Sequence, residues 1–146
     1  MSVTPDLLDL RHCMSNNLQK TARAVSRVYA EEMRPAGLTR AQFPILGVLN
    51  ALGPLAMRDI AQRLYMERTT LTRHLKPLED AGFVNRPPSE TDARVRLISI
   101  TAAGRRKLLQ AERYWQKAQN KMLDRYGAEA WNQLEDALRT LRRLAV

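Results

Sequence analysis

The side chains best suited to binding chemistry lie in a short polar segment, residues 68–73, whose sequence is RTTLTR. If the segment is helical, at about 100° per residue, Thr69, Arg73 and Lys76 fall together on one side. An arginine binds guanine through two hydrogen bonds, and a threonine hydroxyl or methyl group meets several bases in the major groove of DNA. The residues expected to face base edges and phosphates are Arg68, Thr69, Thr70, Thr72, Arg73 and Lys76.

The opposite side of the same helix is apolar. Leu71, Leu75 and Leu78 fall within about 60° of one another, so they are expected to face a core. A solvated surface helix is the alternative interpretation, because charged side chains on a helix face are common. The segments on either side of this helix therefore decide between the two.

A shorter helix is predicted immediately before it, over residues 57–64. Ile60, Ala61 and Leu64 lie on one face of this helix, where they can brace the helix that follows. Only residues 65–67 connect the two helices, and a connection this short is typical of a helix-turn-helix.

A β-hairpin with a long polar tip is predicted after the polar helix. Gly82 tolerates the left-handed conformation that ends many helices, and residues 95–100 form a β-branched run that favours a strand. The polar residues 86–94 lie between them and are expected to form the tip.

Two arginines, Arg94 and Arg96, give this tip its charge. Alternate residues of a strand share a face, so both lie on the side of Ile98 and Ile100, which are expected to dock on the core. A cationic side chain on a narrow tip suits the minor groove of DNA, where the negative potential is strong. Asp92 is expected to support this wing by holding the Arg94 guanidinium in one rotamer.

Several segments in a fixed order complete the pattern: GLT (37–39), QF (42–43), RTTLTR (68–73), LEDAGFV (78–84), DAR (92–94) and LISITAAG (97–104). Together they resemble the MarR family of bacterial winged-helix regulators, over nearly the whole chain. The resemblance implies a mainly α (α+β) fold, a winged helix-turn-helix with long N- and C-terminal dimerisation helices. It also implies sequence-specific binding of double-stranded DNA by a homodimer on a palindromic operator, as a ligand- or stress-responsive repressor.

Long helices are predicted at both ends of the chain. Apolar residues at helical spacing predict one from about Asp6 to Met33, and Thr39 begins the next with Gln42 as its capping-box partner. Two more amphipathic helices follow the hairpin, split by Gly127. The expected organisation is an N-terminal dimerisation helix and linker (1–38), a winged DNA-binding domain (39–101) and C-terminal dimerisation helices (102–146).

The apolar faces of these terminal helices exceed what a small winged domain can cover. Burial against a second copy is therefore expected, because two recognition helices about one DNA turn apart would read a palindrome. Packing within one chain, as a helical bundle, is the alternative.

The formal net charge of +9 over 146 residues favours a polyanionic partner, although charge alone does not separate DNA from RNA or a membrane surface. Two Trp, four Tyr and two Phe are too few for a platform that stacks single-stranded bases, so duplex is favoured. The sequence has neither a signal-peptide pattern nor an apolar run long enough to span a bilayer. We therefore expect a cytoplasmic protein with no membrane partner.

An enzyme is the main competing class of function, and the sequence offers little for one. His12 and His74 lie far apart, and there is no Gly-rich phosphate loop, cluster of metal ligands or nucleophile motif. No catalytic residue, metal or cofactor is therefore expected. A winged helix that binds another protein without specific DNA readout is the remaining alternative, but it would not need Thr69, Arg73 and Arg94 exposed together.

Two features are candidates for sensing a signal. The single cysteine, Cys13, excludes an internal disulfide and a zinc site of several thiolates. A redox-sensing branch of the MarR family has a reactive cysteine in its first helix, but Cys13 lies about half a turn earlier, so an inert, half-buried cysteine is the alternative. The family also binds small aromatic or phenolic anions between the dimerising helices and the winged domain. The candidates for that pocket are Asn17, Phe43 and Trp115, whose types fit an ordinary core equally well.

Overall fold

Helices dominate the computed structural model, which describes residues 10–146, and they carry a small three-stranded sheet. No helix in this part of the chain is long and apolar enough to cross a membrane. In chain order the elements are α1 (Met14–Met33), η1 (Arg34–Ala36), α2 (Gln42–Leu52), β1 (Leu55–Ala56), α3 (Met57–Leu64), α4 (Arg68–Asp80), β2 (Val84–Asn85), β3 (Leu97–Ile100), α5 (Ala102–Tyr126) and α6 (Ala128–Leu144).

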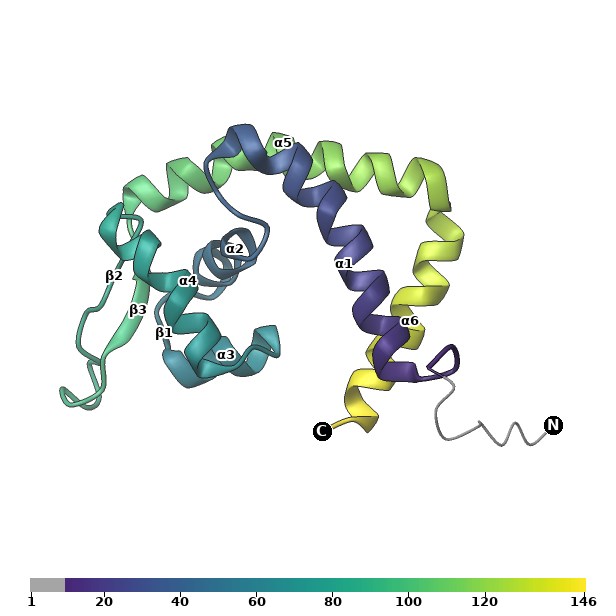
Figure 1. Ribbon diagram of the computed structural model, residues 1–146. Helices are drawn as coiled ribbons and strands as arrows, with labels where there is room; N and C mark the ends of the chain where they lie inside the picture. Colours follow the sequence, from purple (N-terminus) through teal and green to yellow (C-terminus); the bar gives the residue numbers. More distant parts are fainter. Residues whose placement is uncertain (1–9) are drawn as a thin grey trace.

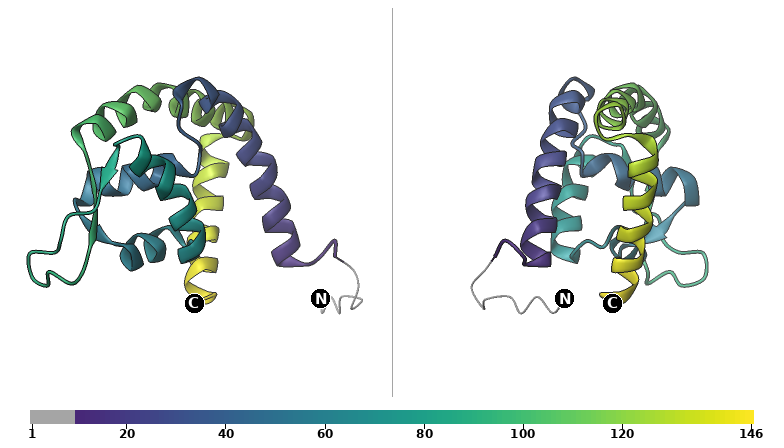
Figure 2. Two further views of the ribbon diagram at one scale, coloured as in Figure 1. Left: turned by 60° about the vertical axis from the view of Figure 1, so that its left-hand side comes forward. Right: turned by 90° about the vertical axis from the view of Figure 1, so that its right-hand side faces the viewer.

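The long helix α5 joins two parts of the molecule (Figure 1). Its first turns lie over α2, α3, α4 and the sheet, which together we call the winged domain. Beyond its middle, α1 and α6 descend from it on the side away from the wing, and we call α1, α5 and α6 the helical arms. Figure 2 shows from two further sides that α1 and α6 run down from α5 as separate helices. Both pack on α5, and α1 shares the longer contact with it.

The winged domain closes a core of its own. Leu71, Leu75 and Leu78 of α4 are at most 1% exposed, which confirms the apolar side predicted for this helix. Ile60 of α3 is fully buried, as predicted for the inner face of residues 57–64. The remaining large core side chains come from α2 and the segment before it, the sheet and the start of α5: Leu38, Ile45, Leu46, Leu49, Val84, Ile98, Ile100 and Leu108.

Strand β3 is the centre of the sheet, in the order β1-β3-β2, and pairs antiparallel with both neighbours. The register Val84↔Ile100 forms the predicted hairpin. The register Leu55↔Ile98 adds strand β1, which the sequence did not predict because its two residues carry no strand pattern of their own. β3 begins at Leu97, two residues later than expected, so the irregular tip is longer than predicted.

Local contacts fix two predicted helix ends. Thr39 and Gln42 form the predicted capping box: Thr39 Oγ1 accepts from the Gln42 backbone N–H at 3.1 Å, and Gln42 Oε1 accepts from the Thr39 N–H at 3.1 Å. The regular part of α2 begins at Gln42, after one turn. Gly82 adopts a φ of 75° beyond the end of α4, which confirms the predicted left-handed stop.

The first helix begins later than predicted. α1 starts at Met14, whereas the prediction placed the start at Asp6, which lies outside the described residues. Leu10 lies exposed in a turn, and Cys13 is the N-cap, its Sγ accepting a hydrogen bond from the Asn16 N–H at 3.5 Å. Apolar spacing alone marks no start, and cysteine is not among the common N-cap residues, so no residue pattern marks this helix start.

The helical arms bury much less of their apolar surface than the winged domain. Met33 is the one buried residue of α1, and α6 has none. The apolar side chains on one side of α6 are only half-buried: Trp131, Leu134, Leu138 and Leu141. Within residues 10–146 the arms therefore leave these apolar faces partly exposed.

Candidate nucleic-acid interface

Helix α4 separates its polar and apolar side chains. The leucines on its inner side anchor it in the core, so its outer side is held toward solvent. Thr70 is half-buried at the edge of that outer side. The other predicted contact residues of this helix are exposed: Arg68, Thr69, Thr72, Arg73 and Lys76.

Two of these side chains have partners within the helix. The Thr72 hydroxyl donates to the carbonyl of Arg68 at 2.9 Å. Lys76 Nζ lies 2.6 Å from Asp80 Oδ1, and this hydrogen bond to a carboxylate raises the pKa of Lys76. Within residues 10–146, Arg68 and Arg73 have no ion-pair partner. The two arginines therefore offer the least compensated positive charge on this face.

A cationic hollow beside α4 was not predicted from the sequence. It has a volume of about 490 Å³, and Arg34, Arg40 and His74 line it. Burial lowers the pKa of the half-buried His74, and the positive charges of Arg73 and Arg40 lower it further. The start of α2 meets α4 only through the tertiary fold, so no local pattern pairs Arg40 with His74.

The wing tip fixes one arginine against a carboxylate. Asp92 Oδ1 accepts hydrogen bonds from the Arg94 backbone N–H at 3.1 Å and from its Nε at 3.2 Å. These bonds, the side-chain one foremost, lower the pKa of the Asp92 carboxyl. The Arg94 side chain is still 92% exposed, and Arg96 is exposed beside its bridge to Pro88. The predicted contact between Asp92 and Arg94 is therefore present, and its use in DNA binding remains a prediction.

The base of the wing is fixed to both neighbouring helices. The Thr101 N–H donates to the carbonyl of Phe83 at 3.0 Å. Gly104 packs so closely that a Cβ there would overlap the carbonyl oxygen of Phe83. An ion pair between Arg86 and Glu79 ties the far side of the wing to α4. The direction of α5 is therefore coupled to the position of α4 and the wing.

The sensing candidates lie in two different places. Phe43 and Trp115 stack on each other, with ring centroids 5.8 Å apart. Asn17 lies in the first turn of α1, where its amide donates to the carbonyls of Arg11 at 2.7 Å and Cys13 at 2.9 Å. The structure thus brings Phe43 and Trp115 together and engages Asn17 in holding the helix start. Cys13 is half-buried at that start, and residues 10–146 contain no cluster of side chains suited to a metal ion.

Comparisons with known proteins agree with this geometry. A family model described as MarR family matches residues 36–95. The HTH-type transcriptional regulator YwoH of Bacillus subtilis is 32% identical over 97 residues, which cover 66% of this chain and 69% of the relative.

Solved structures extend the likeness to the helical arms. The M. tuberculosis transcriptional regulator MosR is 29% identical, with a TM-score of 0.79 over 92% of this chain and 96% of that one. The transcriptional repressor CouR, bound to a 23-mer DNA duplex, shares the fold at 24% identity, with a TM-score of 0.82 over 94% of this chain and 98% of that one. The relatives are transcriptional regulators and not enzymes. The chain belongs to the MarR family of transcriptional regulators.

Proposed function

We propose that this chain acts as a homodimer that binds a palindromic operator in double-stranded DNA and represses neighbouring genes by blocking transcription. The observation that carries the proposal is the outer face of α4, where Arg68 and Arg73 are exposed, without an ion-pair partner among residues 10–146, on a helix anchored by buried leucines. A rigid helix with such a face fits the major groove, where side chains distinguish all four base pairs. A regulator that binds genomic DNA works in the bacterial cytoplasm.

The wing supplies the second contact. The bond to Asp92 fixes the Arg94 guanidinium before DNA arrives, which lowers the entropy cost of presenting it to the minor groove. Arg96, on the same arm of the hairpin, adds charge toward the sugar-phosphate backbone. CouR is bound to a DNA duplex in its solved structure, and the two chains share the fold that carries α4 and the wing, which supports this placement.

The helical arms support the dimer. Half-buried apolar side chains line α6, and a second copy of the chain with the same uncovered face is a self-complementary partner. Two winged domains held about 34 Å apart would present two copies of α4 to successive major grooves on one side of the duplex.

A small aromatic or phenolic effector and a redox signal at Cys13 remain the candidate inputs. The stacked rings of Phe43 and Trp115 lie at the junction of α2 and α5, where an effector would act on both parts of the molecule. For the redox input, DNA release by hydroperoxide should be lost in Cys13→Ser. Equal release from both proteins, or release from neither, would remove Cys13 as the sensor.

The test of the proposed function begins with DNA fragments selected from a genomic library and measures binding by fluorescence anisotropy at several salt concentrations. Arg73→Ala should cost about 1–3 kcal/mol and relax the base preference at one position in each half-site. Arg94→Ala should weaken binding to all sequences and lower the salt slope by about 1 for each chain. Arg113→Ala is the control, because it removes the same charge from the exposed surface of α5.

Wild-type affinity and salt slope in both Arg73→Ala and Arg94→Ala would contradict the docking model. Failure of the wild-type protein to select any duplex would favour a winged helix that binds another protein.

A further inference from the structure

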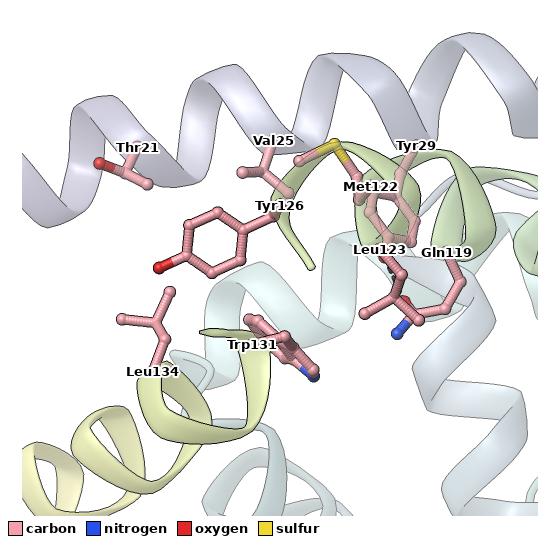
Figure 3. A pocket seen from close by; sticks show the side chains of 9 residues that line it. All are labelled: Thr21, Val25, Tyr29, Gln119, Met122, Leu123, Tyr126, Trp131 and Leu134. Carbon is pink, nitrogen blue, oxygen red and sulfur yellow. Dashed lines mark hydrogen bonds between the residues drawn. The ribbon is translucent and has the colours of Figure 1, made fainter. Parts of the chain in front are cut away.

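The outer surface of α5 differs in charge from the rest of the helical arms. Where the three arms meet, apolar side chains line most of a cavity of about 190 Å³ (Figure 3), and none of the described residues that line it is charged. This cavity belongs to the apolar surface that the proposed dimer would cover. Between Ala102 and Leu123, by contrast, α5 carries six cations and one acid, Glu112. Burial against a second copy does not explain this charge.

Four residues of α5 form a stripe on its solvent side, which we call the basic ridge: Arg106, Gln110, Arg113 and Lys117. Their spacing of four, three and four residues keeps them on one side of the helix over about 16 Å. All four are exposed. The buried residues of α5 lie on the opposite side, where α5 packs on α2. The basic ridge therefore points away from the winged domain, over which α5 lies (Figure 1).

No carboxylate within residues 10–146 forms an ion pair with Arg106, Arg113 or Lys117. The Tyr114 ring instead contacts two of these cations. The Arg113 guanidinium lies 4.7 Å from the ring centroid, and Lys117 Nζ lies 5.9 Å from it. Arg113 also donates a hydrogen bond to the Tyr114 hydroxyl at 2.9 Å. These contacts orient the two cations without cancelling their charge, so less entropy is lost when an anion binds.

An open hollow of about 480 Å³ lies beside the basic ridge, between η1 and α5. Pro35, Leu109 and the half-buried Tyr114 supply apolar surface to it. The Leu109 side chain is 67% exposed, so most of it is free to be covered. Arg113 and Lys107 line the same hollow. Cations and apolar groups therefore lie next to one another on this surface.

This combination favours an acidic protein segment over a nucleic acid. Carboxylates form bidentate hydrogen bonds with arginine, and an apolar side chain beside them would cover Leu109. A phosphate backbone would use the charges alone and leave the apolar surface in water. The acidic side chains of a helix, three and four residues apart, form a stripe that matches the spacing of the basic ridge.

We propose that the basic ridge and the hollow beside it bind an acidic, amphipathic helix of a second protein. Its carboxylates pair with Arg106, Arg113 and Lys117, while an apolar side chain packs on Leu109. The winged domain lies on the other side of α5, and α6 leaves α5 at its far end (Figure 1), so the surfaces proposed for DNA and for a second copy stay free. The proposal does not rest on DNA binding, so it and the proposed function fail separately.

The first experiment uses a synthetic helical peptide of about five turns, with glutamates spaced four, three and four residues apart and leucines beside them. Its control is a peptide of the same composition in scrambled order. Fluorescence anisotropy with the full-length protein gives both affinities. The ordered peptide should bind at least about tenfold more tightly, because only it presents carboxylates and leucines on adjoining faces of one helix.

Two substitutions separate the charge from the apolar contact. Arg113→Ala should weaken binding of the ordered peptide about tenfold, and Leu109→Ser should weaken it about fivefold. Both positions are exposed, so the circular dichroism spectrum should stay that of the wild type. Arg125→Ala is the control, because it removes a cation from an exposed position of α5 outside the basic ridge, and it should leave the affinity unchanged.

A third substitution locates the peptide on the molecule. Arg73→Ala, on the face proposed for DNA, should leave the peptide affinity unchanged. A larger loss from Arg73→Ala than from Arg113→Ala would place the peptide on α4 and overturn the proposal. Equal affinity for the ordered and scrambled peptides, or wild-type affinity in Leu109→Ser, would show that the basic ridge attracts any polyanion and would overturn it as well. Absence of binding at millimolar peptide would have the same consequence.

Discussion

The winged domain and the helical arms are built from similar amphipathic helices but differ in how far they bury them. In the winged domain, Ile60, Leu71 and Leu75 are 0% exposed. In the arms, α6 has no buried residue, and the large apolar side chains Leu18 and Tyr126 are 39% and 52% exposed. Within residues 10–146, the winged domain therefore closes its own core, whereas the arms leave much of their apolar surface exposed.

The largest expected effect comes from opening the complete core. Leu75→Ala leaves a cavity under the recognition helix and should lower the free energy of unfolding by about 2–5 kcal/mol. Urea unfolding measures this loss, which should not vary with protein concentration because the core lies within one chain.

Leu138→Ala on α6 is the matched substitution in the arms. Leu138 is only half-buried in one chain. The free energy of unfolding of this variant should therefore fall mainly when the protein is diluted. If both variants lost the same stability at every concentration, the contrast between the two regions would be wrong.

A smaller loss is expected at the junction of the two regions. Gly104→Ala places a Cβ against the carbonyl of Phe83 and should cost about 1–3 kcal/mol, because backbone on both sides must move. Gly47→Ala is the control, since nothing lies near its Cβ in the middle of α2. That change should stabilise the protein by about 0.5–1 kcal/mol. Equal unfolding midpoints for the two variants would rule out the tight junction.

A pH-dependent effect should be confined to the winged domain. Folded His74 has a pKa below its usual 6.5, so the unfolded chain takes up a proton first as the pH falls. Stability should therefore fall from about pH 7.5 down through the folded pKa, and His74→Gln should lose part of this dependence in thermal unfolding scans. An unchanged pH profile in the variant would show that His74 does not contribute.

The smallest effect on stability is expected at the wing tip. The Asp92 carboxyl has a pKa lowered below 3.8, so its contribution is present above that value and is lost as the pH falls through the folded pKa. Both partners are largely in solvent, so Asp92→Asn should leave the unfolding midpoint nearly unchanged. It should still weaken DNA binding, though less than Arg94→Ala does, because the guanidinium remains but is no longer held. If Asp92→Asn changed the unfolding midpoint but not the DNA affinity, the contact between Asp92 and Arg94 would serve stability and not DNA binding.

The sequence predicted local features well and tertiary ones poorly. Residue types and spacing suffice to predict a feature whose residues are close in the chain. The examples are the Thr39–Gln42 capping box, the end of α4 at Gly82 and the hydrogen bond that Arg94 donates to Asp92. Strand β1 was missed because it is defined by its pairing with β3, and its two residues are too few to show the alternating pattern of a strand.

The candidate site follows the same rule. The polar face of α4 can be read from one helix, whereas the hollow that joins Arg40 to His74 requires α2 and α4 to be packed together. The contact of α1 with α5 likewise joins distant parts of the chain, so no spacing in the sequence predicts it. The start of α1 was predicted too early because apolar spacing continued beyond the true cap.

The most direct test of the central claim is a hydroxyl-radical footprint of the wild-type protein on a selected DNA fragment, repeated with Arg94→Ala. We expect two symmetric protected segments about 10 bp apart, with the flanking minor-groove protection lost in the variant. A single protected segment, or a footprint that Arg94→Ala leaves unchanged, would contradict a dimer that reads DNA with both helix and wing.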